Sequence, residues 1–179
     1  RYVVVIKNAV GAMDATAVQF TDQIDANTTL VPGSLVSAPI AIDDSYSTVG
    51  NTSISVPAAS GLIANDVNLN GTPMTATAID QTGTMGTVVG NSDGSFTFNP
   101  SPGFEGTTTF TYTVSNGAFA SVGTVTVTVT GMIWYINASA AAGGDGRLNT
   151  PFNTINDFNA TSLDGTGDNI FVYSGTYNN

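Results

Sequence analysis

The chain of 179 residues carries 13 Asp and Glu residues against 3 Lys and Arg residues, which gives a formal net charge of −10. So few basic residues argue against a nucleic-acid partner, because phosphates are contacted mainly by Lys and Arg. The absence of cysteine and histidine excludes disulfides and zinc knuckles, and it removes the commonest general base. No apolar run has the length of a membrane span, and the excess of carboxylates favours cations as partners.

The surface polarity must come mainly from Thr, Ser, Asn and Gly, because charged residues make up only 9% of the chain. Such a composition is typical of extracellular β proteins rather than of helical cytosolic enzymes. Neither an initiator Met nor a signal peptide precedes the first strand-like run, at residues 2–6. We therefore expect an excerpt of a longer extracellular or cell-surface protein.

Segments that alternate apolar and hydroxyl-bearing residues dominate the middle of the chain. This period of two predicts half-buried antiparallel strands at residues 53–56, 95–98, 109–114 and 123–130. In the last two segments the threonines would face solvent, and the core would be formed by Phe110, Tyr112, Val114, Val125, Val127 and Val129.

Turn signals separate these segments. Asn-Gly pairs occur at 70–71 and 116–117, and Asp-Gly occurs at 93–94. Short strands divided by such turns predict an all-β protein built on an antiparallel sandwich. Only residues 151–160 carry a helical period, with Pro151 at the first helical position.

Composition divides the chain into three predicted pieces. Residues 1–38 contain an apolar strand and a Val-Pro-Gly-Ser turn. Residues 39–130 hold the run of strands, and residues 131–179 are richer in glycine and aromatic residues.

The middle piece contains, in order, "DDSYS", "GLIAND", "DGSFTFNP", "GFEGTTTFTYTVSNG" and "TVTVTV". With these landmarks it resembles the bacterial Ig-like or cadherin-like tandem repeat of large secreted and surface proteins. The resemblance implies a β-sandwich of the kind strung along adhesins and stalks, with calcium bound at loops and junctions.

The flanking pieces resemble parts of other surface modules. Residues 1–38, with "VPGS" near their end, are similar to the C-terminal half of a different, DUF11-like surface repeat. Residues 131–179, with "WYI", "GGDG" and "GDNIFVYSGTY", resemble the N-terminal cap of a right-handed parallel β-helix. Such helices occur in adhesins and in polysaccharide lyases, so the cap does not choose between the two.

A first candidate metal site lies in "GLIANDVNLNGTP", residues 61–73, where Asp66, Asn68 and Asn70 alternate before Gly71. Calcium takes six to eight oxygen ligands, mostly from carboxylates and carbonyls. The family loop that this stretch resembles has aspartate where this chain has Asn68 and Asn70, so two charges are replaced and binding should be weak. The alternative, which we place first, is a tight turn at 70–71 in which Asp66 bonds backbone amides.

Asp43 and Asp44 form a second candidate, at the start of the sandwich. Adjacent carboxylates repel each other unless a cation or backbone amides offset their charge. The resemblance implies calcium at such module junctions, and the alternative is a solvated hinge.

No catalytic residue is assigned. We expect a structural spacer or adhesin segment whose partners are neighbouring modules or other copies of the chain, in one version as a filament built by strand pairing. The alternative is an accessory segment of a secreted β-helix polysaccharide-active enzyme.

Overall fold

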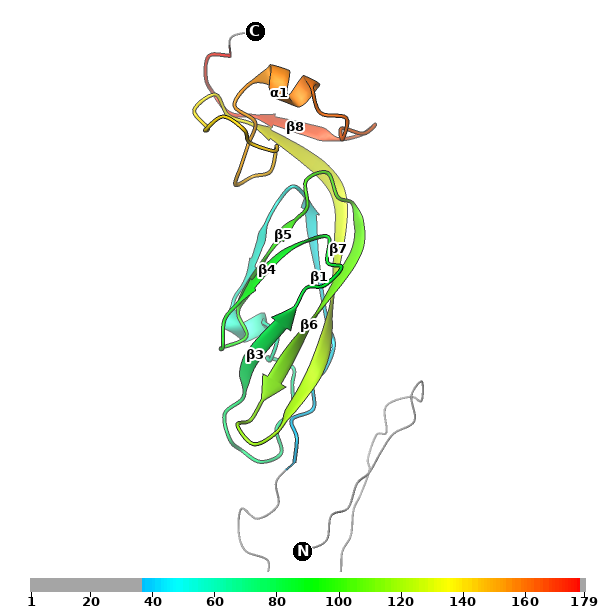
Figure 1. The fold of residues 1–179 in the computed structure, drawn as a ribbon, viewed down its shortest axis with the longest axis vertical. Helices are drawn as coiled ribbons and strands as arrows, with labels where there is room; N and C mark the ends of the chain where they lie inside the picture. Colours follow the sequence, from blue (N-terminus) through cyan, green and yellow to red (C-terminus); the bar gives the residue numbers. More distant parts are fainter. Residues whose placement is uncertain (1–36, 178–179) are drawn as a thin grey trace, which may run out of the picture. The chain divides into compact units, whose positions relative to one another are not determined.

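The computed structural model describes residues 37–177, so almost all of the predicted first piece lies outside the described residues. Two sheets form the sandwich (Figure 1). The larger sheet joins, in spatial order, β1 (Asp44–Gly50), β7 (Ala120–Ile136), β6 (Gly106–Ser115) and β3 (Thr75–Asp80). The smaller sheet joins β2 (Ile54–Val56), β5 (Phe96–Pro100) and β4 (Gly86–Gly90). The predicted all-β sandwich is confirmed.

The alternating pattern places the core between the two sheets. The six side chains of β6 and β7 predicted to face inward are at most 2% exposed. From the smaller sheet, Phe96 and Phe98 point into the same core and are 1% and 0% exposed. Phe96 contacts Phe110 edge to face, with ring centroids 5.6 Å apart, an arrangement that aromatic rings favour.

Strands β1 and β7 of the larger sheet pair in parallel. The register runs from Asp44↔Val125 to Thr48↔Val129, whereas β6 pairs with both β7 and β3 in antiparallel fashion. Because β1 joins β7 directly, its first residue, Asp44, lies beside the core-facing valines of β7.

β7 continues past the sandwich into a second, smaller core. Its last residues pair in parallel with β8 (Asn169–Val172), and the buried residues of this core are Met132, Trp134, Ile136 and Phe152. The predicted boundary between the second and third pieces, at residues 130–131, therefore falls inside one continuous strand.

The predicted helix at 151–160 is shorter than expected. The helix α1 covers Ile155–Asn159, and Thr154 caps it by accepting a hydrogen bond from the Asp157 N–H. Pro151 is not its first residue, because the Phe152 N–H donates to the Tyr135 carbonyl of β7 at 3.0 Å. The backbone of Phe152 thus pairs with β7, and the helix predicted from the periodicity cannot include it.

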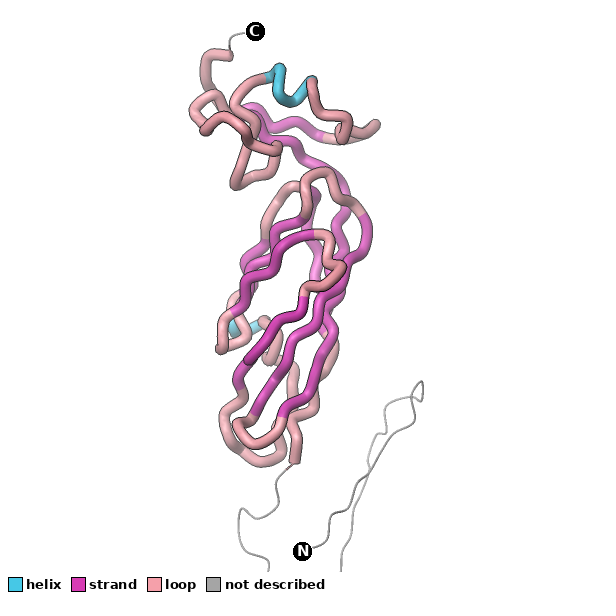
Figure 2. The backbone as a smooth tube through the Cα atoms, in the orientation of Figure 1, coloured by secondary structure: helices cyan, strands magenta, loops and turns pink. Residues whose placement is uncertain are grey.

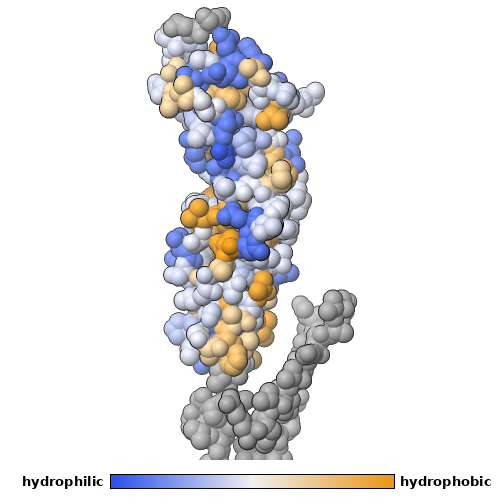
Figure 3. All heavy atoms as spheres, in the orientation of Figure 1, coloured by the Kyte–Doolittle hydropathy of each residue, from blue (hydrophilic) through white to orange (hydrophobic). Residues whose placement is uncertain are grey.

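Strands dominate the described chain, and the only helical turns in residues 37–177 are α1 and the 3-10 turn η1 (Ala58–Ser60) (Figure 2). No helix in this part of the chain is long and apolar enough to cross a membrane. The face drawn in Figure 3 is mostly polar or weakly apolar, with small separate hydrophobic patches. This matches a surface built from Thr, Ser, Asn and Gly.

Candidate metal site at the start of the sandwich

The loop of residues 61–73 lies against the chain that enters β1, because Ile40 and Val67 form an antiparallel bridge. The Ile40 N–H donates to the Val67 carbonyl at 2.8 Å, and the Val67 N–H donates back at 3.0 Å. The bridge brings Asp66 next to the residues before β1, where its Oδ1 accepts the Ile42 N–H at 2.8 Å. Asp66 thus bonds a backbone amide, as expected, but the amide belongs to Ile42 before β1 and not to its own loop.

A tyrosine hydroxyl from β6 also reaches Asp66. The Tyr112 hydroxyl donates to Asp66 Oδ1 at 2.8 Å and lies 3.1 Å from the Ile42 carbonyl. Its ring is 1% exposed in the main core, and burial raises the pKa of Tyr112 well above its ordinary value. The sequence analysis placed Tyr112 in the core but missed this contact. The one signal for it is that a buried tyrosine carries a hydroxyl, which usually needs a hydrogen-bond partner.

Asp44 and Asp66 act on each other electrostatically. Burial and then the negative charge of Asp66 raise the pKa of Asp44 to about 6, against the lowering effect of a hydrogen bond from Asn65. Burial also raises the pKa of Asp66, although the bonds from Ile42 and Tyr112 lower it. Within the described residues, the Oδ2 atoms of both aspartates are buried and have no hydrogen-bond partner. Two such acceptors without donors are costly when ionised, and a bound cation would offset that cost.

Asp43 has a different partner from its neighbour Asp44. Its Oδ1 accepts the Thr124 N–H of β7 at 2.8 Å, and its side chain is exposed. A backbone amide thus offsets part of the charge of Asp43. This is one of the two ways, an amide or a cation, in which we expected the repulsion between adjacent carboxylates to be relieved. Its charge still adds to the raised pKa of Asp44.

Asn68 and Asn70 belong to a neighbouring polar network. Asn70 Oδ1 accepts the Ser37 N–H at 2.9 Å, and its amide donates to the Ser37 carbonyl at 2.7 Å. Asn68 Oδ1 accepts from the Asn70 N–H at 3.2 Å and from the Asn116 amide at 3.3 Å. With Gly71 at a φ of 71°, this is the geometry of a polar turn.

Of the five predicted metal residues, Asp44 and Asp66 therefore influence each other's charge. Asp43 bonds to Thr124 and also acts on Asp44. The amide oxygens of Asn68 and Asn70 have other hydrogen-bond partners. Within residues 37–177 no group of three or more acidic, His or Cys side chains is arranged to hold a metal ion. Any ion here would need further oxygens from the backbone or from water.

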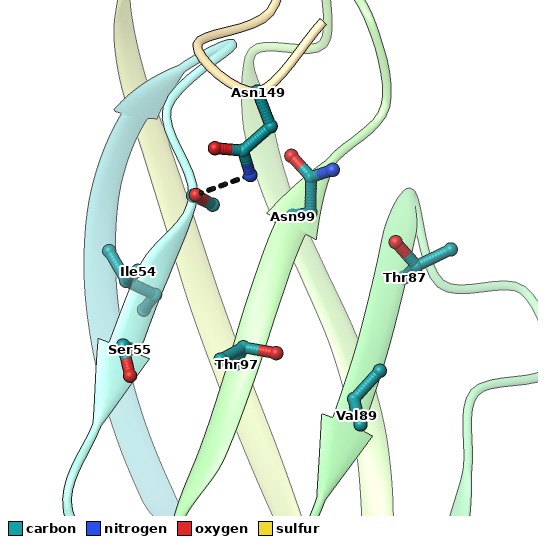
Figure 4. Close-up of a pocket in the computed structure, with 8 residues that line it drawn as sticks. Ile54, Ser55, Thr87, Val89, Thr97, Asn99 and Asn149 are labelled. Carbon is teal, nitrogen blue, oxygen red and sulfur yellow. Dashed lines mark hydrogen bonds between the residues drawn. The ribbon is translucent and has the colours of Figure 1, made fainter.

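A shallow groove of about 320 Å³ runs over the outer face of the smaller sheet (Figure 4). The Asn149 amide bridges its rim by donating to Ser53 Oγ at 3.0 Å. The groove is lined by Ser53, Ile54, Ser55, Thr87, Val89, Thr97, Asn99 and Asn149. None of these side chains is acidic or basic, so this lining offers no acid–base pair for catalysis.

The two packed sheets define a β-sandwich module of the cadherin-like class. The model of the bacterial cadherin-like domain family matches residues 37–131, which is just over half of the chain, and the chain belongs to this family. Domains of this family are typically non-catalytic and occur in extracellular proteins. No curated protein matches the chain.

Solved structures show low similarity to the chain. Human protocadherin-24 EC1-2 shares 14% identity at a TM-score of 0.40, covering 62% of this chain and 56% of that one. A putative alpha-galactosidase from Bacteroides fragilis shares 14% identity at a TM-score of 0.38, covering 60% and 22%. The endo-fucoidan hydrolase MfFcnA4 from glycoside hydrolase family 107 shares 19% identity at a TM-score of 0.35, covering 56% and 14%. The chain thus spans less than two thirds of each of these chains, and at these values the similarity says nothing of ligand or activity.

Proposed function

We propose that this chain is a structural spacer or adhesion segment of a modular extracellular protein, and that calcium bound at Asp44 and Asp66 fixes the entry of the chain into the sandwich. The family supports the structural part of the proposal. The observation that carries the calcium part is the pair of buried, unpartnered Oδ2 atoms on the two aspartates.

The residues at the site fit a weak calcium site rather than a strong one. Asp44 and Asp66 each offer a free carboxylate oxygen, whereas the Ile42 carbonyl already accepts from the Asn65 amide at 3.3 Å and from the Tyr112 hydroxyl at 3.1 Å. Calcium requires six to eight oxygens, so water would complete the shell. We expect affinity in the range of roughly 10⁻⁴–10⁻³ M that is usual for extracellular modules.

An ion at this position would add to the Ile40–Val67 bridge and to the bonds that Asp66 and Asn65 make to Ile42. Asp66 belongs to the loop of residues 61–73, and Asp44 begins β1. A shared ion would tie the loop to the strand, so that the entry to the module would be stiff when calcium is present. This is the property that a spacer between modules requires.

Thermal unfolding of the full chain in millimolar calcium and then in chelator tests the proposal. We expect calcium to raise the melting temperature, and Asp66→Asn to remove that rise. Asp164→Asn makes the same acid-to-amide change at an exposed position and should keep the full calcium response. A wild-type midpoint that ignores calcium would contradict the calcium claim, and an equal response in Asp66→Asn would place the ion elsewhere.

The partners in this proposal are neighbouring modules of the same protein or other copies of this chain. The parallel pairing of β7 with β8 supports the further expectation that residues 131–179 begin a parallel β-helix. In one version of the proposal, copies of the chain associate into a filament by pairing exposed strand edges.

A further inference from the structure

β1 and β7 lie side by side and run lengthwise through the sandwich in the same direction (Figure 1). Six residue pairs join them, from Asp44↔Val125 to Gly50↔Met132. Within the described residues, the other four strand pairings of the sandwich are antiparallel. The chain therefore enters the β1–β7 pair at one end, before Asp44, and leaves it at the other end, along β7 toward Ile136.

The direction of the two strands decides how a pulling force acts on this pair. A force on the chain before Asp44 pulls β1 backward along its axis, and a force on the chain after β7 pulls that strand forward. Because the two forces oppose each other along parallel strands, the evenly spaced hydrogen bonds of the whole pair must stretch together. In the antiparallel β6–β7 pair, by contrast, Gly106 lies opposite Val129, and forces on those two residues would break the bonds one after another.

The side chains of β1 and β7 also resist sliding. Val125, Val127 and Val129 of β7 are at most 1% exposed. The Tyr46 ring of β1 packs edge to face on Phe96 of the smaller sheet, with ring centroids 5.0 Å apart. A slip of one residue would turn every side chain of β1 to the opposite face, and a slip of two would pull Tyr46 off Phe96. The core thus fixes the register of the pair in addition to its hydrogen bonds.

Contacts before β1 continue the same alignment. The Ser121 hydroxyl of β7 donates to the Pro39 carbonyl at 2.5 Å, and the Thr124 N–H donates to Asp43 Oδ1 at 2.8 Å. Residues 39–43 thus follow β7 in the direction that β1 then keeps. These bonds lengthen the region over which the entering chain is held to β7.

We propose that the β1–β7 pair is a mechanical clamp, which passes a load on the chain directly from β1 into β7. Strands β2 to β6 lie between β1 and β7 in the sequence, but they would carry little of that load until the clamp breaks. The proposal rests on the spacer role proposed above, because neighbouring modules would supply the load. It names what that role requires of the sandwich, which is resistance to stretching along the chain.

The second core passes a load from the C-terminal side to β7 in the same way. The end of β7 pairs in parallel with β8 through four residue pairs, from Ile133↔Asn169 to Ile136↔Val172. A force on the chain after β8 therefore also acts along a parallel pair. Both pairs bear the same force, and the pair with fewer residues should open first.

Single-molecule pulling of the full chain tests the clamp in two directions. The chain has no cysteine, so two introduced cysteines can carry the handles. Ala38→Cys with Thr176→Cys, both at exposed positions, loads the chain lengthwise. Val49→Cys with Thr130→Cys also uses exposed positions, but these lie at the same end of the β1–β7 pair. Pulling on them loads its bonds one after another.

We expect the sandwich to open at a force about twofold or more higher in the lengthwise direction, because forced unfolding reports the unfolding rate and hence its barrier. Lengthwise opening of the sandwich should release about 25–30 nm, close to the extended length of residues 44–129. This distinguishes it from the shorter step of the second core. Equal forces in the two directions, or a lower lengthwise force, would overturn the proposal.

Two core variants test whether the load follows this path. Tyr46→Ala removes the contact of β1 with Phe96, and Val88→Ala shortens a side chain of β4 that is 5% exposed. Both should lower the free energy of unfolding in urea. Tyr46→Ala should lower the lengthwise force far more than Val88→Ala, because β4 lies outside the clamp. Equal losses of force in the two variants would overturn the proposed path.

Pulling in chelator keeps this test separate from the calcium proposal. The melt in calcium tests Asp44 and Asp66, whereas the two pulling directions test the β1–β7 pairing without an ion. Failure of one experiment therefore leaves the other result intact.

Discussion

The Tyr112 hydroxyl donates a 2.8 Å hydrogen bond to Asp66 Oδ1, and this contact joins the main core to the loop of residues 61–73. The tyrosine ring is buried among the valines of β6 and β7, whereas the carboxylate belongs to the polar start of the sandwich. Packing and the candidate cation site are therefore coupled through one side chain.

Tyr112→Phe should destabilise the fold by about 1–3 kcal/mol, because a partly buried carboxylate loses its hydroxyl donor while the ring packing is kept. Urea unfolding measures this cost. Tyr46→Phe is the matched control, since its hydroxyl donates to the Ser60 carbonyl at 2.9 Å in an exposed position and should matter less. Equal losses in the two variants would contradict a special role for the bond to Asp66.

Gly123→Ala should also disturb Tyr112. The two residues face each other across β6 and β7, and a Cβ at Gly123 would lie 2.5 Å from the Tyr112 ring and 2.7 Å from its hydroxyl oxygen. The ring must shift, which we expect to cost about 1–3 kcal/mol. Val122→Ala, at a neighbouring position that is 64% exposed, should change the unfolding free energy by less than about 0.5 kcal/mol.

The raised pKa of Asp44 predicts an unusual pH dependence in chelator. Its pKa is about 6 in the folded chain against an ordinary value of 3.8, so the folded state holds this proton more tightly than the unfolded state. Stability should therefore fall as the pH rises from about 4 to about 6 and level off above that. Unfolding free energies at stepped pH values measure the slope.

Asp44→Asn should flatten this slope and leave the smaller part that belongs to Asp66, whose pKa is also raised. Asp145 gives the control. Burial raises its pKa, but hydrogen bonds from Arg147 and Thr150 outweigh burial and lower it overall. Asp145→Asn should thus weaken the fold without changing the slope between pH 4 and 6. A stability that rises through this window would contradict the assignment to Asp44.

Asn51 should be a sensitive position where the sandwich meets the C-terminal segment. It is 0% exposed, has a φ of 63°, and its Oδ1 accepts the Gly103 N–H at 2.9 Å. Its carbonyl accepts the Leu148 N–H at 2.8 Å. Asn51→Gly keeps the backbone conformation and loses the side-chain bond, which we expect to cost about 1–3 kcal/mol.

Asn51→Ala should cost roughly 1 kcal/mol more, because alanine adds left-handed strain to the lost bond. Guanidinium unfolding followed by Trp134 emission and by circular dichroism measures both variants. A result in which the alanine variant is more stable than the glycine variant would show that the backbone at this position is not strained.

The sequence predicted the parts of the fold that depend on local pattern. Alternation in β6 and β7 identified the buried valines and aromatic residues correctly, because the period of a strand sends successive side chains to opposite faces. The segments of β1, β3 and β4 alternate weakly and lie toward sheet edges, and they were not predicted. The helix prediction was too long, because Phe152 bonds to β7 instead.

For the candidate site, the sequence by itself determined which side chains carry oxygen ligands and that the chain has few cations to neutralise them. Only the tertiary structure decided which of them meet. The Ile40–Val67 bridge brings Asp66 to Asp44, while Ser37 and Asn116 engage Asn70 and Asn68. The reason is physical: spacing along the chain fixes which face a side chain takes, whereas pairing between distant backbones fixes its neighbours and therefore its burial and its pKa.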